Sequence, residues 1–535
     1  MSNSSHSEII DLLDRANRGG IKVTYGNAEQ LSLKIAHGLT PAGDLIDKLK
    51  LNKKEIIRYL EQFQLQHSLF SSQETDTLSK DGNLYYETTP IQDYWLNHLK
   101  DKEYKENEST HGNILLTYEV RGALDMALLS KSISTVVHRH ESLHSTFHQI
   151  GNRFYLKVEQ DLTPYEPEVI DLREKKNLLA GLEGLAKLDD RPLVLLGGAL
   201  FFSRIIQLSA ERYIISLKLH HVIDDTWSDE ILMSELTYCY HCFQRHKPVE
   251  LKTLSFQFKD YLSFVNRDRK QNRLKHKAYW ERLYQTLPGP LILPGAVRPG
   301  KRLQKDRLLE SRILEITPEI RDQVHHLSRH FSTTAFVILQ AALKAFIFNK
   351  TRQHDILIGT IISGRDHLET QGQIGSYAST ALIRTVFDHA DSFSDAVFKV
   401  IKSNQDLAEY KAYSLTDHIN SMLLPGQNYD SFWKINVLYS DKKTGFYTDG
   451  NETERLTQDL NLSFKPIYQE TQRLIPIDFI LRFVNFKDKL LLNFQYDSST
   501  YDDAYVDGLL QDYHDYLHLV ISDVNGCLLT DAAAS

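Results

Sequence analysis

The sequence has little cysteine for its length. Its 535 residues include three cysteines, at positions 239, 242 and 527, and three thiols cannot cross-link a chain of this size, which argues against a disulfide-rich secreted protein. The first ten residues, MSNSSHSEII, lack the basic and apolar segments of a signal peptide. No apolar run reaches the roughly 18 residues that span a bilayer. We therefore expect a cytoplasmic protein that does not act in a membrane.

The sequence also lacks an excess of positive charge. Its formal net charge is -8, which argues against a general nucleic-acid-binding protein. A hydrophobic content of 41% and an aromatic content of 10% are typical of globular proteins. At roughly 100 to 200 residues per domain, the length predicts two to four domains.

One pair of cysteines has the spacing of a metal site. The tetrapeptide CYHC, 239–242, encloses His241, but a second CxxC is missing and the stretch has the pattern of a helix interior. We interpret these cysteines as packing thiols and expect no metal.

Residues 1–64 have the pattern of a small separate domain. Apolar residues from Ile9 to Ala16 keep helical spacing, and the glycines of NRGG end that helix. Two alternating runs, IKVTY and LSLKIA, predict a hairpin. Thr40 and Asn52 are N-cap residues of two further helices. The predicted order is helix, strand, strand, helix, helix.

Two breaks divide the rest of the chain. Residues 65–83 are rich in Ser, Thr, Gln and Asp, which predicts a linker. A second linker, 288–304, lies in a proline-rich stretch. The segments on either side of it, 84–287 and 305–530, both alternate strands with long helices. We expect an α+β protein whose main part consists of two α/β lobes.

The stretch LKLHHVIDDTWSDEIL, 217–232, carries the candidate chemistry. His220 and His221 end an alternating, strand-like run, and Asp225 follows before a helical segment. Side chains at such a strand–loop–helix joint reach clefts. Asp225 could orient the imidazole of His221, as in hydrolase triads. It could also turn away and pair with an arginine, leaving His221 as a base. Spacing alone leaves both arrangements open, and a solvated polar loop as well.

Several stretches, in order, resemble condensation domains of nonribosomal peptide synthetases, which have the chloramphenicol acetyltransferase-like fold. HHVIDDTWS is similar to the HHxxxDG motif with its following Trp and Ser, here Trp227 and Ser228. RHESLHSTF, which starts at Arg139, resembles RHExLRTxF. TTPIQDYWL resembles the opening motif with its Gln and Trp. FKDYLSF resembles YxDFA, IGTIISGRD the latch region, and IGSYASTALIR the IGxFVNTxxxR motif.

The resemblance implies two acetyltransferase-like lobes in a V-shaped pseudodimer with a tunnel between them. His220, His221 and Asp225 are implied as catalytic residues. An amine would attack an acyl thioester beside His221, which accepts the amine proton or holds the amine while the oxyanion is stabilised. Asp225 is implied to be structural and paired with an arginine, for which we expect Arg139. The chain itself needs no cofactor, because a peptidyl carrier protein brings the substrate on its phosphopantetheine arm.

Three positions depart from the family pattern. Thr226 replaces the motif glycine. This replacement narrows one channel, or it changes the backbone if the glycine of the motif has a positive φ. His144 stands where the second arginine of the earlier motif is usual, and Ser379 where the asparagine of FVNT is usual. Because both histidines and Asp225 are kept, we expect an active enzyme. The alternative is an inactive recruitment domain, a related class that typically loses the histidine motif.

The first 64 residues resemble the TubC-type docking domains of peptide synthetase assembly lines. Such domains bind the C-terminal tail of the upstream synthetase, which adds as a strand to the hairpin. The accepting edge would consist of Leu31, Ser32, Leu33, Lys34 and Ile35. Basic residues follow the hairpin, namely Lys48, Lys50, Lys53, Lys54 and Arg58. They predict an acidic tail and salt-sensitive binding; the alternative is that they form a solvated helix face.

The sequence contains no adenylation motif, carrier serine or thioesterase elbow. If the chain is complete, it resembles the stand-alone terminal condensation proteins of rhabdopeptide-type systems, in which a small free amine releases the peptide as an amide. If the chain is part of a longer protein, the acceptor is an aminoacyl carrier protein.

Overall fold

The computed structural model describes most residues after 76 and parts of the first 57. The described residues are 9, 12, 16, 21–26, 30–35, 43–57, 77–97, 112–160, 164–174, 193–254, 256–286, 288–289, 291–294, 309–410, 434–441, 456–467, 477–486, 488–498 and 500–529.

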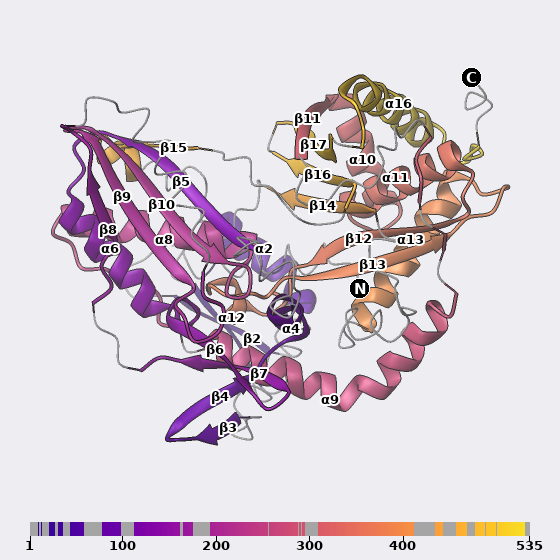
Figure 1. Ribbon diagram of the computed structural model, residues 1–535. Coiled ribbons are helices and arrows are strands. Elements are labelled where there is room, and N and C mark those ends of the chain that lie inside the picture. Colours follow the sequence, from indigo (N-terminus) through magenta and orange to yellow (C-terminus); the bar gives the residue numbers. More distant parts are fainter. Residues whose placement is uncertain are drawn as a thin grey trace.

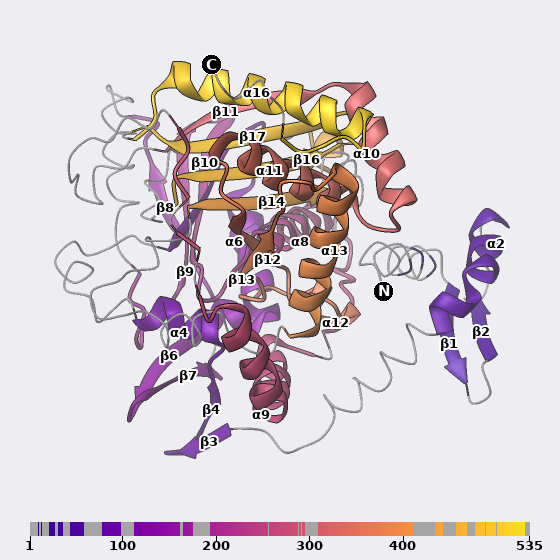
Figure 2. The same ribbon diagram turned by 90° about the vertical axis from the view of Figure 1, so that its right-hand side faces the viewer.

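The N-terminal residues contain a two-stranded hairpin. β1 (Ile21–Gly26) and β2 (Gln30–Ile35) pair antiparallel, so the predicted hairpin is confirmed. α2 (Gly43–Leu51) follows, and Figure 2 shows these three elements apart from the larger body. Asn52 precedes the helical residues 53–57; its carbonyl accepts a hydrogen bond from the Ile56 N–H at 2.9 Å, while its Nδ2 donates to the Lys48 carbonyl at 2.9 Å. Thr40 and NRGG lie outside the described residues. The hairpin packs on a small core of Ile9, Leu12, Ala16, Leu45, Leu49 and Ile56.

A five-stranded sheet with the order β15-β5-β10-β9-β8 organises the first lobe. β10 (Arg212–His220) lies at its centre, antiparallel to β5 (Asn113–Arg121) and β9 (Phe201–Ser209), while β8 (Glu168–Asp171) forms one edge. Residues 213–220 of β10 are all buried, which differs from a strand with one polar, exposed face. The chain therefore reaches His220 on a rigid, covered strand.

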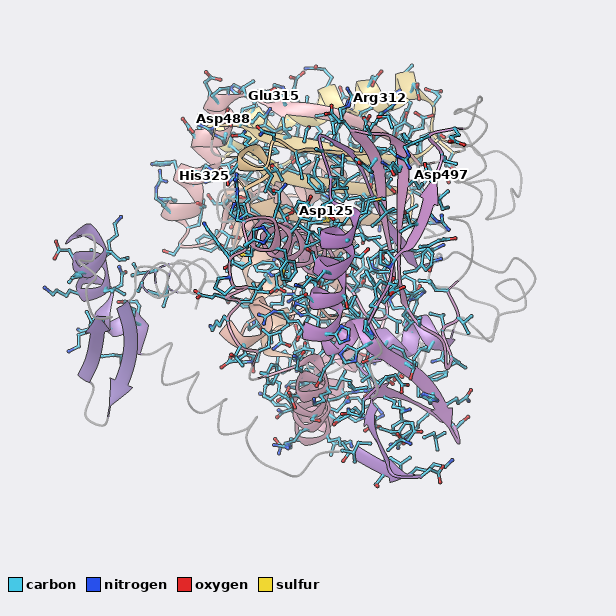
Figure 3. The ribbon with its side chains drawn as sticks, turned by 90° about the vertical axis from the view of Figure 1, so that its left-hand side faces the viewer. Asp125, Arg312, Glu315, His325, Asp488 and Asp497 are labelled. Atoms are coloured by element: carbon cyan, nitrogen blue, oxygen red, sulfur yellow. The ribbon has the colours of Figure 1, made fainter. Side chains whose placement is uncertain are left out.

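Two helices of this lobe, α6 (Met126–Arg139) and α8 (Thr226–Gln244), pack on each other. Asp125 caps α6, since its Oδ1 accepts hydrogen bonds from the N–H groups of Ala127 and Leu128. Figure 3 labels Asp125 at the start of this helix. Asp225 caps α8 through the N–H of Ser228 at 2.9 Å. The cap fixes where the motif loop ends and the helix begins.

The predicted linker 65–83 needs a correction. Residues 77–80 form β3 (Thr77–Lys80), which pairs with β4 (Asn83–Glu87). Asp81 and Gly82 connect them with φ angles of 51° and 75°, the left-handed pair that a two-residue type I′ turn requires. β3 and β4 continue into a four-stranded sheet with β7 (Arg153–Val158) and β6 (Ser145–Ile150). The polar composition of this stretch led to the prediction of a linker, although Asp81 and Gly82 form the turn of a hairpin.

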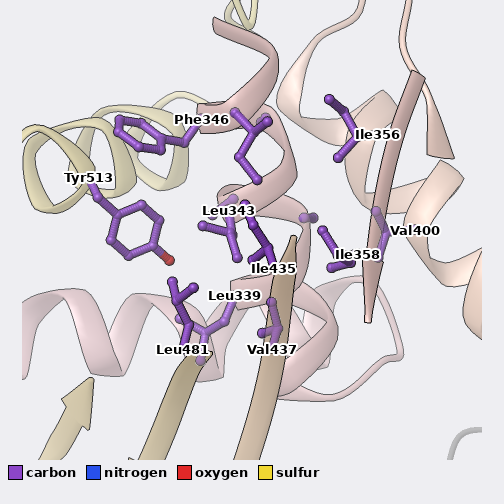
Figure 4. Close-up of a cluster of buried hydrophobic side chains, with 14 of the residues drawn as sticks. Leu339, Leu343, Phe346, Ile356, Ile358, Val400, Ile435, Val437, Leu481 and Tyr513 are labelled. Carbon is purple, nitrogen blue, oxygen red and sulfur yellow. The ribbon is translucent and has the colours of Figure 1, made fainter. Parts of the chain in front are cut away.

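A six-stranded sheet organises the second lobe, and its main core lies on α11 (Ala335–Thr351). Figure 4 shows Leu339, Leu343 and Phe346 of this helix against Val437 and Tyr513. The other helices are α10 (Pro318–His330), α12 (Leu368–Gln371), α13 (Phe393–Glu409) and α16 (Asp503–Ser522). The strands are β11 (Leu309–Ile316), β12 (Asp355–Ile362), β13 (Ser379–Val386), β14 (Ile435–Asp441), β16 (Phe479–Asn485) and β17 (Leu490–Asp497).

The two lobes exchange chain segments. α9 (Phe258–Leu283) runs below both in Figure 1; its first residue is buried in the first core and Trp280 in the second. β15 (Ser463–Pro466) pairs with β5 of the first lobe, and Leu460 and Leu462 pack in the first core. The predicted second lobe, 305–530, is therefore wrong for residues 456–467, which leave it to complete the first sheet.

Among the described residues, no single helix has the length and hydropathy to cross a membrane, although α10 and α11, bent by 107°, pass that test as a pair.

Candidate active site

The two motif histidines occupy the end of β10. His220 is 1% exposed, and its Nδ1 accepts a hydrogen bond from the Val222 N–H at 3.0 Å. This bond places the proton of a neutral His220 on Nε2. The N–H of His221 donates to the Gly112 carbonyl at 2.8 Å, and the Trp95 ring stacks on the imidazole of His221 at 5.4 Å between centroids. The His220 ring is thus fixed by a hydrogen bond, while His221 is held by its backbone and by the Trp95 ring.

The opening motif supplies part of this support. Trp95 and Gln92, its Trp and Gln, lie on α4 (Pro90–Asn97). The Gln92 side chain is fully buried, and its Nε2 donates to the Val222 carbonyl at 2.9 Å. Trp95 also meets the His220 ring edge-on, with centroids 5.8 Å apart. α4 therefore clamps the histidine loop from outside the HHxxxD sequence.

Asp225 is bound by groups other than the imidazoles. Its Oδ1 accepts from Ser228 Oγ and from the Arg365 guanidinium, both at 2.8 Å. Its Oδ2 accepts from the Arg365 Nε and the Ala378 N–H, both at 3.3 Å. These contacts match the arrangement in which Asp225 fixes the loop, rather than a hydrolase-like triad.

The predicted Arg139–Asp225 pair is wrong. The Nε of Arg139 donates to Glu235 at 3.0 Å, and the Nε2 of the neighbouring His140 contacts the same carboxylate at 2.8 Å. Glu235 lies ten residues along α8 from Asp225, which at 1.5 Å per residue is roughly 15 Å. The end of α6 therefore meets the middle of α8 and not its capped end. The partner is Arg365, which lies in IGTIISGRD, a stretch that matched a family motif without indicating a contact to Asp225.

Arg365 anchors the motif loop to the second lobe. It is 4% exposed and donates to Ser228 Oγ and the Gln373 carbonyl, both at 2.8 Å. Its guanidinium also lies 4.2 Å from the centre of the Tyr377 ring, a cation–π arrangement. Trp227 adds a second link, since its Nε1 donates to the Gln371 carbonyl at 3.0 Å.

Thr226, His144 and Ser379 lie in different surroundings. Thr226 is exposed, begins α8 and is not among the residues with positive φ, so its backbone is one that a threonine adopts without strain. Ser379 begins β13 opposite Ile362. The Nδ1 of His144 lies 3.2 Å from the Glu159 carbonyl, and burial lowers the pKa of His144.

The CxxC pair lies inside α8. Cys239 and Cys242 are buried, and burial raises the pKa of the Cys239 thiol to about 12. They pack as apolar groups, as predicted. In the part of the chain that the structure describes, no three His, Cys, Asp or Glu side chains are grouped so that they could hold a metal ion.

The candidate docking residues are described in part. Residues Leu31 to Ile35 lie in β2, which forms a two-stranded sheet with β1 in the described residues. Leu33 packs on the small core, while the side chains of Ser32 and Lys34 lie outside the described part. The four lysines Lys48, Lys50, Lys53 and Lys54 are exposed.

Comparison with known proteins gives consistent matches. The condensation domain family matches residues 83–528. One of the proteins that make up the linear gramicidin synthase of Brevibacillus parabrevis is 32% identical over 318 residues, which are 58% of this chain and 6% of that protein. Bacitracin synthase 1 of Bacillus licheniformis is 25% identical over 456 residues, 83% of this chain and 8% of that protein. The chain thus spans less than a tenth of the length of either relative.

Two solved structures share the fold. The X-domain from teicoplanin biosynthesis has a TM-score of 0.68 at 18% identity, covering 84% of this chain and 98% of that one. The first condensation domain of the calcium-dependent antibiotic synthetase, in complex with a substrate analogue, has a TM-score of 0.60 at 18% identity, with coverages of 83% and 98%.

Proposed function

The chain belongs to the condensation domain family, whose members catalyse amide-bond formation in nonribosomal peptide synthesis, and we propose that it joins a carrier-bound acyl or peptidyl thioester to an amine. The observation that carries this proposal is the fixed pair His220 and His221 at the end of β10, tied to the second lobe through Asp225 and Arg365. All three residues of the HHxxxD motif are present; the histidines contact partners in the first lobe, and Asp225 ties their loop to the second lobe.

The reaction needs positioning and one proton transfer. The amine nitrogen attacks the thioester carbon, a tetrahedral oxyanion forms, and the carbon–sulfur bond breaks to release the phosphopantetheine thiol. The proton lost by the amine passes to His221 or, by way of it, to the leaving sulfur. Alignment of two bound reactants accounts for a large part of such a rate enhancement. The buried, tautomer-fixed His220 serves to hold the backbone from which His221 projects.

The acceptor in this proposal is a small free amine, so that the reaction releases the peptide as an amide. The donor is a peptidyl carrier protein of an upstream synthetase, whose acidic C-terminal tail binds along β2 beside the four lysines. The exposed lysines of the docking residues support this charge preference. The lobes form the V-shaped pseudodimer of the family, and the phosphopantetheine arm enters between them.

The direct test uses a carrier protein loaded with a peptidyl thioester and a small amine such as phenylethylamine. We expect soluble amide with the wild-type chain and none above background with His221→Ala, whose fold is checked by its melting temperature. Transfer to an aminoacyl carrier protein but not to any free amine would instead identify an internal condensation domain.

A second candidate is a recruitment domain without catalysis. A protein of the same fold, the X-domain from teicoplanin biosynthesis, has been solved in complex with OxyB, which favours a binding role, while the complete histidine motif of this chain opposes it. Binding of an upstream partner by a chain that forms no amide with any acceptor would support this function.

A further inference from the structure

Two further aspartates flank the cap of α8. With Asp225 as N-cap, Asp224 occupies the position before it, N′, and Asp229 occupies N4. Side chains at N′ and N4 meet at the start of a helix, where two apolar residues often form a hydrophobic staple. In this chain the two positions that normally pack together both carry carboxyl groups.

These carboxyl groups lie where charge is poorly tolerated. Asp224 is 1% exposed, and neither of its oxygens accepts a hydrogen bond from any donor in the described part of the chain. The Oδ1 of Asp229 is buried and equally without a donor there. A buried carboxylate without a donor is strongly destabilising, and the carboxylate of the partly buried Asp229 beside it also repels it when both are ionised. One proton between the two groups removes both problems.

The surroundings act in the same direction. Burial, followed by the charge of Asp229, raises the pKa of Asp224 well above its ordinary value, and burial also raises the pKa of Asp229. The other charged groups that act on the pair are Asp225 and Glu230, which add repulsion, and Arg365, which opposes it. Arg365 is bound to Asp225, so its charge is largely neutralised at the pair.

We propose that Asp224 and Asp229 share one proton and form a carboxyl–carboxylate staple that holds the His221 loop against the first turn of α8. The staple carries one negative charge, which suits the positive end of the helix dipole. Only Val222 and Ile223 separate His221 from Asp224, and the backbone of Val222 is the group that His220 and Gln92 bind. Asp224 and Asp229 are thus positioning residues for His221. Loss of the shared proton pushes Asp224 away and disturbs that loop.

The test compares the wild type with Asp229→Asn across pH. The amide that this substitution introduces donates to the Asp224 carboxylate, so the variant keeps the staple and cannot lose its bridging hydrogen by titration. We expect equal melting temperatures near pH 6.5. As pH rises to 9.5, the melting temperature of the variant should increasingly exceed that of the wild type. We compare kcat/KM of the variant with that of the wild type as a ratio, because the ionisation of the amine substrate affects both proteins equally. Between pH 6.5 and pH 9.5 this ratio should rise from one to roughly threefold or more, since each pH unit above the pKa of the shared proton changes it up to tenfold.

Infrared spectroscopy tests the proton directly and independently of the proposed reaction. The wild type at pH 7 should show the carbonyl stretch of one buried protonated carboxyl group, which Asp229→Asn lacks. Glu319→Gln, an exposed carboxylate in the first turn of α10, is the matched control and should change neither readout. The staple is overturned if the wild type lacks this band. It is also overturned if the difference in melting temperature between Asp229→Asn and the wild type is the same at pH 6.5 and pH 9.5, and both outcomes hold even if the chain forms amides.

Discussion

Arg365 and Asp225 join the two lobes through a buried ion pair, 2.8 Å between the guanidinium nitrogen and Oδ1. The arginine follows β12 of the second lobe, and the aspartate caps α8 of the first. The pair spans 140 residues of sequence, so the end of the histidine loop is bound by a residue from the other lobe. The chemistry of the first lobe therefore depends on a residue of the second.

Replacing Arg365 should damage both stability and amide formation. Arg365→Ala leaves Asp225 buried without its partner, for which a loss of about 3–5 kcal/mol is expected. Arg365→Lys keeps the charge but loses the forked contacts to Asp225 and Ser228. Arg139→Lys is the matched control, since Arg139 pairs with Glu235 and not with Asp225. Urea unfolding and kcat should be affected more by Arg365→Lys; a larger effect of Arg139→Lys contradicts this assignment.

A side chain at Gly112 should disrupt the histidine pair. Gly112 has φ +81°, and a Cβ there would lie 2.7 Å from His220 Nε2 and 3.2 Å from the Trp95 ring. Gly82 also has a positive φ, +75°, but open space around it. We expect Gly82→Ala to lose about 1–2 kcal/mol from backbone conformation alone, and Gly112→Ala to lose more and to lower kcat. Equal losses, measured by thermal unfolding, would show that the His220 ring moves aside freely.

Local sequence patterns predicted the parts of the site that local physics determines. The alternating run located β10, and Asp225 with the following helical segment located the start of α8. The two-residue turn at Asp81 and Gly82 was not predicted because it lies within a polar stretch, although Asp-Gly between short strands is a hairpin signal.

The partner of Asp225 was beyond such patterns. Arg139 and Arg365 both lie in family motifs, and nothing within either motif tells which arginine faces the end of α8 and which faces its middle. The same applies to β15, whose pairing with β5 crosses between lobes. Contacts between residues so far apart in the sequence depend on how whole helices and strands pack.

Thr226→Gly tests whether this position shapes an acceptor channel. Thr226 is exposed at the first position of α8, so the glycine variant should lose no more than about 1 kcal/mol of stability. If the side chain lines an acceptor channel, competition between small and bulky amines should shift towards the bulky ones by several-fold. Product ratios measured by mass spectrometry that match those of the wild type would remove Thr226 from the channel.

Charge reversal should reveal docking through α2 and the helical residues 53–57 that follow it. Lys48, Lys50, Lys53 and Lys54 are exposed, so replacing all four by Glu is expected to leave the fold intact. The variant should bind an acidic tail tenfold or more weakly than the wild type at low salt. Raising the salt concentration should weaken the wild type and narrow this gap, because screening removes the attraction. Calorimetry with a tail peptide measures both effects, and activity on a small soluble thioester serves as the control. Unchanged affinity in the reversed variant assigns these lysines to a solvated face.

Lys344 gives the second lobe a pH-dependent core. This residue of α11 is fully buried, and its Nζ donates to the Ile383 carbonyl at 2.9 Å and to Thr385 Oγ1 at 2.7 Å. Burial lowers the pKa of Lys344 well below its ordinary value, so the unfolded chain binds the proton more tightly. Stability therefore falls as pH decreases below the unfolded value near 10.4. Lys344→Met removes this proton linkage, and we expect a gain in melting temperature that is larger at pH 6 than at pH 9. A gain that stays constant across this range would mean that Lys344 keeps its charge in the core.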